Sequence, residues 1–194
     1  MGAPMKLVCG LGNPGREYAR HRHNAGRMVV EALGHKLGAS FARHKSEALA
    51  AQVGLGPVRL VLLLPETYMN LSGVPLGELA RFYKLATADV LVVHDELDLP
   101  FGRLQLKDGG GTGGHNGLKS IRESWGEDAY GRLRFGIGKP QGPDARERVV
   151  GHVLGDFSKD EAAALPELLA RAAEMAEAWA RLGMAQAMNA FNRR

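Results

Sequence analysis

Asparagine and histidine side chains stand beside tight-turn glycines in several parts of this 194-residue sequence, at residues 10–15 with 23–26, at 68–73 and at 113–117. A further segment, 94–100, follows an apolar run and carries three acids. A buried asparagine amide needs partners for its donors and for its acceptor. Several such amides, held by rigid turns near a histidine and an aspartate, predict a polar cleft suited to hydrolysis without a metal or a cofactor.

His23 is the candidate general base, because an unperturbed imidazole titrates near pH ~6.5 and accepts a proton at neutral pH without special tuning. Its other ring nitrogen needs an orienting carboxylate. Asp95 stands at the end of an apolar run and is the predicted partner, with Glu96 and Asp98 as weaker candidates. Taken alone, Asp95 is also typical of an acid that caps a turn. The sequence lacks the Gly-x-Ser-x-Gly pattern of a nucleophilic serine, and Cys9 is expected to be buried, so water is the predicted attacking group.

Three asparagines, Asn13, Asn70 and Asn116, are predicted to hold substrate amides, the reacting water or the developing oxyanion. A preorganised donor of this kind contributes about 3 kcal/mol to transition-state stabilisation. Each asparagine alone is also a common turn residue, but three beside tight-turn glycines favour a shared site. Tyr68 and Met69 precede Asn70 and are predicted to form an apolar slot for an acyl or peptide group, although ordinary core packing explains them equally well.

The pattern Gly10-x-Gly12-x-x-Gly15 matches the dinucleotide-binding fingerprint only in its letters. Pro14 removes a backbone donor that a pyrophosphate would need, and no acid-terminated strand follows at the expected distance. We therefore interpret this segment as a turn that presents Asn13 at the carboxyl end of a strand, where open α/β sheets bind ligands.

The sequence also disfavours a nucleotide triphosphatase and a metal enzyme. In the glycine-rich segment 113–120, Leu118 separates Gly117 from Lys119, which breaks the P-loop spacing, although the backbone donors still suit an oxyanion. The seven histidines include no His-x-x-x-His pair, and no cysteine cluster accompanies them. We expect no metal site.

Hydrophobic periodicity predicts the elements that must position these residues. Ser158 with Glu161 forms a capping-box pattern before a long alanine-rich helix, which Pro166 is expected to split. The 116–125 helix is expected to open at His115 or Asn116. Alternating strands and helices with one hairpin predict an α/β fold, a single domain with a twisted mixed β-sheet flanked by helices. Strands are predicted at 6–9, 47–53, 58–64, 90–93, 103–107 and 132–137, and helices at 24–37, 75–84, 116–125 and beyond 158.

Composition is consistent with one cytoplasmic domain. Hydrophobic residues make up 45% of the chain, which is enough for a core. The formal charge of +4 permits a polyanionic partner such as RNA without requiring one. A single cysteine forms no internal disulfide, and the longest strongly apolar run, 58–64, is too short to cross a bilayer, so no membrane association is expected.

Several motifs, in the same order along the chain, resemble the bacterial peptidyl-tRNA hydrolase family. The resemblance runs from about Lys6 to the final helix. It rests on Gly12-Asn13-Pro14-Gly15-x-x-Tyr18, Arg22-His23-Asn24-Ala25-Gly26, Met69-Asn70-Leu71-Ser72-Gly73, His94-Asp95-Glu96-Leu97-Asp98-Leu99-Pro100, Gly114-His115-Asn116-Gly117-Leu118, Arg132-Leu133-Arg134-Phe135-Gly136-Ile137-Gly138 and Val150-Gly151-His152-Val153-Leu154-Gly155.

The resemblance implies an esterase that cleaves the peptide from the 3′ end of peptidyl-tRNA released from ribosomes, which recycles the tRNA. It implies that His23 is the base and Asp95 its partner. Asn13 and Asn70 would position the peptidyl part and the substrate carbonyl, and Asn116 would help to hold the water and the tRNA end.

The resemblance also assigns residues to substrate binding. It implies that Tyr18 borders the tRNA 3′ terminus and that Met69 lines the cleft, and we place His115 among the substrate-binding residues with them. Lys107 and Arg134 align with basic positions that contact tRNA phosphate.

The family fold is a single mixed-sheet domain, so we expect one domain over residues 1–194 with the C-terminal helices on the same core. The family is also usually monomeric and metal-free. The sequence departs from the family pattern at Gln105, where many members have lysine, and at Thr112, where some have histidine. Asp108 places an acid beside Lys107, and we expect it to neutralise Lys107 in part and so to weaken phosphate binding on this side of the cleft.

Two alternatives remain open on the sequence alone. The first is a general small-ester or peptide hydrolase that uses the same cleft, with the basic charge incidental. The second is a non-catalytic RNA-binding module in which His23 and Asp95 are structural.

Overall fold

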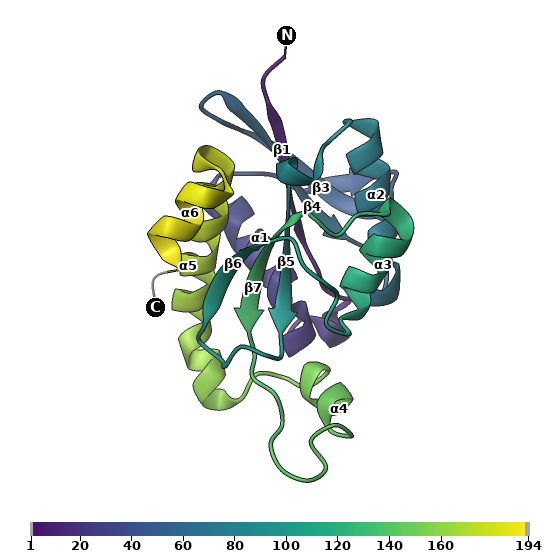
Figure 1. The fold of residues 1–194 in the computed structure, drawn as a ribbon, viewed down its shortest axis with the longest axis vertical. Helices are drawn as coiled ribbons and strands as arrows, with labels where there is room; N and C mark the ends of the chain where they lie inside the picture. Colours follow the sequence, from purple (N-terminus) through teal and green to yellow (C-terminus); the bar gives the residue numbers. More distant parts are fainter. Residues whose placement is uncertain (1, 193–194) are drawn as a thin grey trace.

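A single seven-stranded mixed sheet forms the centre of the computed structural model, which describes residues 2–192 (Figure 1). The strand order is β2-β3-β4-β1-β5-β7-β6. Neighbours in the central run β4-β1-β5-β7 are parallel, whereas β2, β3 and β6 pair antiparallel at the two edges. The strands are β1 (Met5–Gly10), β2 (Ala42–His44), β3 (Ala48–Leu55), β4 (Val58–Pro65), β5 (Val90–Glu96), β6 (Leu104–Asp108) and β7 (Gly131–Gly136).

Helices cover both faces of the sheet (Figure 1). Helices α1 and α5 pack against one face, and α2 packs against α3 on the other. The helices are α1 (Ala25–Lys36), α2 (Gly73–Phe82), α3 (Asn116–Trp125), α4 (Val149–Val153), α5 (Lys159–Leu182) and α6 (Met184–Phe191). Short 3₁₀ turns are η1 (Arg16–Tyr18), η2 (Arg22–Asn24), η3 (Met69–Leu71) and η4 (Thr87–Asp89).

Alternate residues of the central strands enter two separate cores, as the pleat of a strand requires. In β1, Val8 belongs to the core that α1 and α5 cover, whereas Leu7 and Cys9 belong to the core under α2 and α3. Trp179 of α5 is fully buried in the first of these cores. Because parallel strands run in one direction, their carboxyl ends meet at one edge, where the loops from β1, β4 and β5 converge.

The expected α/β class with a mixed sheet is confirmed, and the predicted strands and helices are present with shifted ends. The predicted hairpin has a shorter turn, because β3 and β4 leave only Gly56 and Pro57 between them. The strand predicted at 90–93 continues to Glu96, so that the candidate partner Asp95 lies inside β5. Residues 1 and 193–194 of the expected domain lie outside the described part of the chain.

The prediction that Pro166 splits the C-terminal helix is wrong, because α5 runs through it without a break. Proline removes one backbone hydrogen bond from a helix interior. Pro166 lies on the exposed side, and the following turns bury Ala172, Met175, Ala176 and Trp179 in the core. That packing offsets the local cost. The short elements β2 and α4 were not expected from the sequence, and the break between the C-terminal helices lies at Gly183. Within residues 2–192, no helix has the length and hydropathy to cross a bilayer.

Candidate active site

The candidate site lies at the carboxyl end of β5, where η2 contacts the strand and His115, the N-cap of α3, reaches Asp95. Helix α1 starts at Ala25, two residues after His23, and Gly26 in its first turn touches the β5 backbone. A Cβ at Gly26 would lie 2.0 Å from the carbonyl oxygen of Val93. Only glycine permits this approach, which brings η2 and its histidine against β5.

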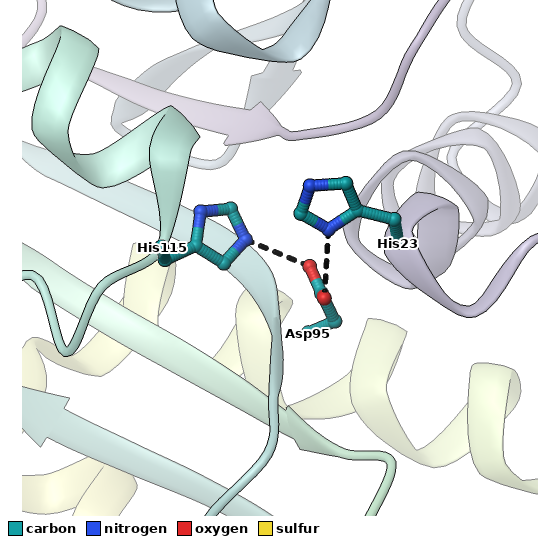
Figure 2. A group of neighbouring side chains, drawn as sticks. All are labelled: His23, Asp95 and His115. Carbon is teal, nitrogen blue, oxygen red and sulfur yellow. Dashed lines mark hydrogen bonds and ion pairs between the residues drawn. The ribbon is translucent and has the colours of Figure 1, made fainter. Parts of the chain in front are cut away.

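His23 and Asp95 form a direct hydrogen bond of 2.8 Å between Nδ1 of the imidazole and Oδ2 of the carboxylate (Figure 2). Both residues are buried, with His23 8% and Asp95 3% exposed. An ionised carboxylate only accepts hydrogen bonds, so Nδ1 carries the proton and donates it. The other nitrogen, Nε2, is then unprotonated, and it points away from Asp95 (Figure 2).

The surroundings shift the pKa of both partners. Burial favours the neutral imidazole, but the charge of Asp95 and its hydrogen bond outweigh burial and raise the pKa of His23 above its ordinary value. Burial would raise the pKa of Asp95, but the interactions with His115 and His23 hold it well below its usual range. Asp95 is therefore a carboxylate throughout the neutral pH range, and His23 can store a proton without losing its partner.

His115 contacts the second oxygen of the same carboxylate. Its Nε2 lies 2.8 Å from Oδ1 of Asp95, and its ring lies 4.9 Å from the ring of His23 (Figure 2). The residue also caps α3, because Nδ1 accepts hydrogen bonds from the backbone amides of Gly117 at 3.0 Å and Leu118 at 3.4 Å. Asp95 thus lies between two imidazoles from different elements.

The neighbouring His94 is also buried, with 2% of its surface exposed. Burial, followed by the proximity of His115, lowers the pKa of His94 to about 3. Its Nδ1 lies 2.8 Å from the backbone oxygen of Asp95 and donates to it. His94 is a neutral packing partner of the site in the neutral pH range.

Asn13 occupies a turn that two asparagines build together. Its backbone amide donates to Oδ1 of Asn24 at 2.9 Å, and Nδ2 of Asn24 donates back to the carbonyl of Asn13 at 2.9 Å. The Oδ1 atom of Asn13 accepts the backbone amide of Met69 at 2.7 Å, which ties the β1 turn to η3. Within residues 2–192, Nδ2 of Asn13 has no partner. Sequence reasoning missed Asn24, although its place beside His23 in a glycine-ended motif was a usable signal.

Met69, Tyr68 and Asn70 follow the same turn. Met69 is buried, and the absence of a side chain at Gly117 makes room for it, since a Cβ there would lie 2.7 Å from Sδ. Tyr68 is 59% exposed, and its ring meets that of Tyr18 edge-on at 6.2 Å. Asn70 is exposed on η3.

Some of the sequence-predicted residues line one of three hollows, whereas Tyr18, Tyr68, Met69 and Asn70 line none of these. A cavity of about 660 Å³ is lined by His23, Asp95, His115 and Asn116, and by three valines from the α4 region. Asn13 lines a separate pocket of about 290 Å³. Lys107 and Arg134 line a third of about 250 Å³. The structure therefore unites the base, its partner and one asparagine directly, and it links Asn13 and Asn70 to them only through the neighbouring turns.

The two predicted phosphate ligands differ in how free they are. Lys107 is exposed and makes no ion pair with any residue in 2–192. Asp108 follows it in β6, and successive strand residues point to opposite faces, so the expected neutralisation of Lys107 by Asp108 has no support from the geometry. Arg134 donates to Glu96 at 2.9 Å and to the side chain of Gln105.

A buried arginine that sequence reasoning missed holds the glycine loop in place. Arg132 is 3% exposed, and its guanidinium donates to the backbone oxygens of Gly110, Gly111 and Asp128. Its burial lowers its pKa. The loop that precedes His115 is thereby anchored to β7, which limits where His115 can lie.

The same three residues that build the hydrogen-bonded site are a candidate metal-ligand set. The ligand atoms of His23, Asp95 and His115 lie within 4.8 Å of one another. Both imidazole nitrogens that face Asp95 carry the protons of its hydrogen bonds, so a cation would have to displace two protons to enter. The arrangement is suited to acid–base chemistry.

Comparisons with known proteins give a consistent answer over almost the whole chain. A family model described as "Peptidyl-tRNA hydrolase" matches residues 7–194. Proteins of that name are similar to this chain: one from Geobacter sp. (strain M21) is 45% identical over 97% of this chain and 98% of its own length, and one from Cereibacter sphaeroides (strain ATCC 17029 / ATH 2.4.9) is 52% identical over 96% and 81%. The crystal structure of the Acinetobacter baumannii enzyme matches with a TM-score of 0.90 at 39% identity, covering 100% of this chain and 97% of that one.

Proposed function

The chain belongs to the peptidyl-tRNA hydrolase family and hydrolyses the ester bond of peptidyl-tRNA, and we propose that it does so with a water molecule activated by His23. The observation that carries the proposal is the 2.8 Å hydrogen bond between His23 and Asp95 beside a cavity of about 660 Å³. It leaves Nε2 of His23 as a base whose orientation is fixed by a carboxylate that is ionised throughout the neutral pH range.

The reaction proceeds by direct attack. Nε2 of His23 accepts a proton from water as the oxygen of that water bonds to the ester carbonyl carbon. The tetrahedral intermediate then breaks its bond to the ribose oxygen of tRNA, and the imidazolium returns the proton to that leaving oxygen. The products are the peptide acid and tRNA with a free hydroxyl. Asp95 remains ionised throughout and stabilises the imidazolium.

Asparagine amides support the substrate in this proposal. The free Nδ2 of Asn13 is available to donate to a carbonyl of the peptidyl part, because Oδ1 is committed to Met69. Asn116 lines the same cavity as His23, and we assign it to the water and the tRNA end. We assign Asn70, which is exposed on η3, and the neighbouring Tyr68 to the peptide. Tyr18, whose ring meets that of Tyr68, is assigned to the border of the tRNA terminus.

Phosphate contacts are assigned to the basic pocket beside the glycine loop. Lys107 is exposed and unpaired within the described residues, so it is the stronger candidate. The guanidinium of Arg134 already donates to Glu96 and Gln105, so we expect Arg134 to contribute less than Lys107 to phosphate binding. Such contacts fix the position of the nucleic acid and make affinity depend on salt.

The deciding experiment compares two substrates in the presence of a chelator: N-acetyl-aminoacyl-tRNA and a small ester. We expect rapid cleavage of the first alone, unaffected by chelation. Comparable cleavage of the small ester would favour a general hydrolase.

A variant tests the base itself. His23→Ala should still bind tRNA without turnover, whereas His35→Ala, at an exposed histidine on α1, serves as the matched control. Unchanged turnover of His23→Ala would reject the mechanism.

We further propose that the protein acts as a monomer in the cytoplasm. The proposal of a monomer is supported by a site built from elements of one chain, with β1, β5, η2 and α3 supplying its residues. Light scattering at assay concentrations tests it, and a mass of twice 20.9 kDa would contradict it.

A further inference from the structure

We propose that His115 is a positioning residue. Its neutral imidazole donates the second hydrogen bond to Asp95, which fixes the orientation of that carboxylate and limits how strongly it stabilises protonated His23. The inference rests on the proposed role of His23 as base. It gives His115 a place in the reaction different from direct substrate binding.

The hydrogen bonds of His115 determine which of its nitrogens carries the proton. Backbone amides can only donate, so Nδ1, which faces the amides of Gly117 and Leu118, must be an unprotonated acceptor. The single proton of a neutral ring is then on Nε2. That atom lies 2.8 Å from Oδ1 of Asp95 and donates to it.

The same bonds prevent His115 from acting as the base. A proton on Nδ1 would replace both capping interactions by repulsion between donors, and it would place a cation at the positively polarised start of α3. His23 has no such constraint, since the structure gives its Nε2 no partner within residues 2–192. Of the two imidazoles around Asp95 in Figure 2, only that of His23 has a ring nitrogen without a hydrogen-bond partner within residues 2–192, so His23 is the one placed to take a proton from water.

The hydrogen bond from His115 limits how strongly Asp95 stabilises the protonated form of His23. Asp95 has both oxygens occupied, so the carboxylate cannot rotate away from His23, and its negative charge is shared between two N–H groups. Without the bond from His115, the carboxylate would stabilise protonated His23 more strongly. The pKa of His23 would then rise, and less of the free base would be present at a given pH below that value.

The other ionisable groups near Asp95 do not influence the pKa of His23 in this way. His94 packs edge-on against His115, with ring centroids 5.3 Å apart, and stays neutral in the neutral pH range. Arg132 is bound to the carbonyls of the glycine loop. Glu96 pairs with Arg134 at 2.9 Å. Asp98, Lys139 and Arg146 also border the cavity, and Asp98 pairs with Lys139 at 3.3 Å.

Two substitutions separate the capping role of His115 from its bond to Asp95. His115→Asn keeps a side-chain acceptor for the α3 amides, since asparagine is a strong N-cap, but it is too short to reach Asp95. His115→Gln can place an amide N–H near the position of Nε2, but it is a weaker cap. The readout is the pKa of His23, followed by NMR of the ring nitrogens in the free protein, together with the pH profile of kcat/KM.

We expect His115→Asn to retain a melting temperature close to that of the wild type and to raise the pKa of His23 by about half a unit to one unit. The acid limb of kcat/KM should move upward with it. His115→Gln should leave the pKa of His23 near the wild-type value and lower the melting temperature. NMR of the wild type should show His115 protonated on Nε2 alone at neutral pH.

An unchanged pKa of His23 in His115→Asn, or a proton on Nδ1 of His115 in the wild type, would overturn the proposal. These measurements need no turnover. Failure of the wider mechanism is a separate result, because it would appear as retained activity in His23→Ala.

Discussion

Replacing Asp95 with asparagine should disable the base while leaving the shape of the site almost unchanged. The wild-type carboxylate accepts one N–H from His23 and one from His115, each at 2.8 Å. An asparagine offers one acceptor and one donor in the same place. Because His115 is fixed as a donor by its capping bonds, the amide oxygen must face His115, and the amide nitrogen must face His23.

This arrangement forces the proton of His23 from Nδ1 to Nε2, which removes the lone pair that would accept the proton of water. We expect kcat to fall by about 10² to 10⁴-fold, as for other enzymes in which the wrong imidazole tautomer is stabilised. The free energy of unfolding at pH 7 should also fall by about 1–3 kcal/mol, because a buried charge-assisted hydrogen bond is lost.

The stability effect should depend on pH in a defined direction. The pKa of Asp95 in the folded protein lies below its unfolded value, so its contribution is present above about pH 4 and is lost as the pH falls. Asp95→Asn should remove that component of acid sensitivity. Urea unfolding at several pH values measures this effect.

Single-turnover cleavage of N-acetyl-aminoacyl-tRNA measures the kinetic effect. Asp160→Asn is the matched control, because it makes the same chemical change at an exposed carboxylate in the first turn of α5, which does not line the cavity beside His23. A rate for Asp95→Asn within a few-fold of the control would refute the reasoning.

Three further outcomes are expected. The value of kcat/KM should fall on the acid side with an apparent pKa above 6.5, because Asp95 raises the pKa of His23; a limb at or below pH 6 would contradict this. Lys107→Ala should weaken tRNA binding and reduce the slope of log affinity against log salt by nearly one, more than Arg134→Ala does, whereas Lys84→Ala, at an exposed residue just beyond the C-terminal end of α2, should change neither. Asn192→Ala should lower the free energy of unfolding in urea by about 1–2 kcal/mol, because its amide exchanges hydrogen bonds of 2.9 and 2.7 Å with the backbone of edge strand β6; an unchanged transition would show that this edge does not need the amide.

The sheet was predictable where strands are apolar and bounded by glycine. The runs that became β1 and β4 are buried from Leu7 and from Leu60 onward, so hydrophobicity alone identified them. The end of β5 was not predictable in the same way, because His94 and Asp95 are polar yet buried. Their burial depends on partners from η2 and α3, which lie far away in the sequence. Local patterns contain no such information.

The site was predictable in its residue types but not in all of its contacts. Turn glycines and a strand end were sufficient to propose His23, Asp95 and Asn13 as neighbours. The bond between His115 and Asp95 was not expected, because it depends on a loop that Arg132 anchors to β7. The sequence around Pro166 also could not show that α5 continues through it, because the packing that offsets the lost backbone hydrogen bond comes from the rest of the domain.

The most direct test of water activation by His23 is turnover of N-acetyl-aminoacyl-tRNA by His23→Ala, measured with and without added imidazole. The account predicts loss of at least about 10²-fold in kcat without imidazole, and partial recovery that follows the fraction of unprotonated imidazole as the pH is raised. Turnover close to the wild-type rate without imidazole would show that another group activates the water.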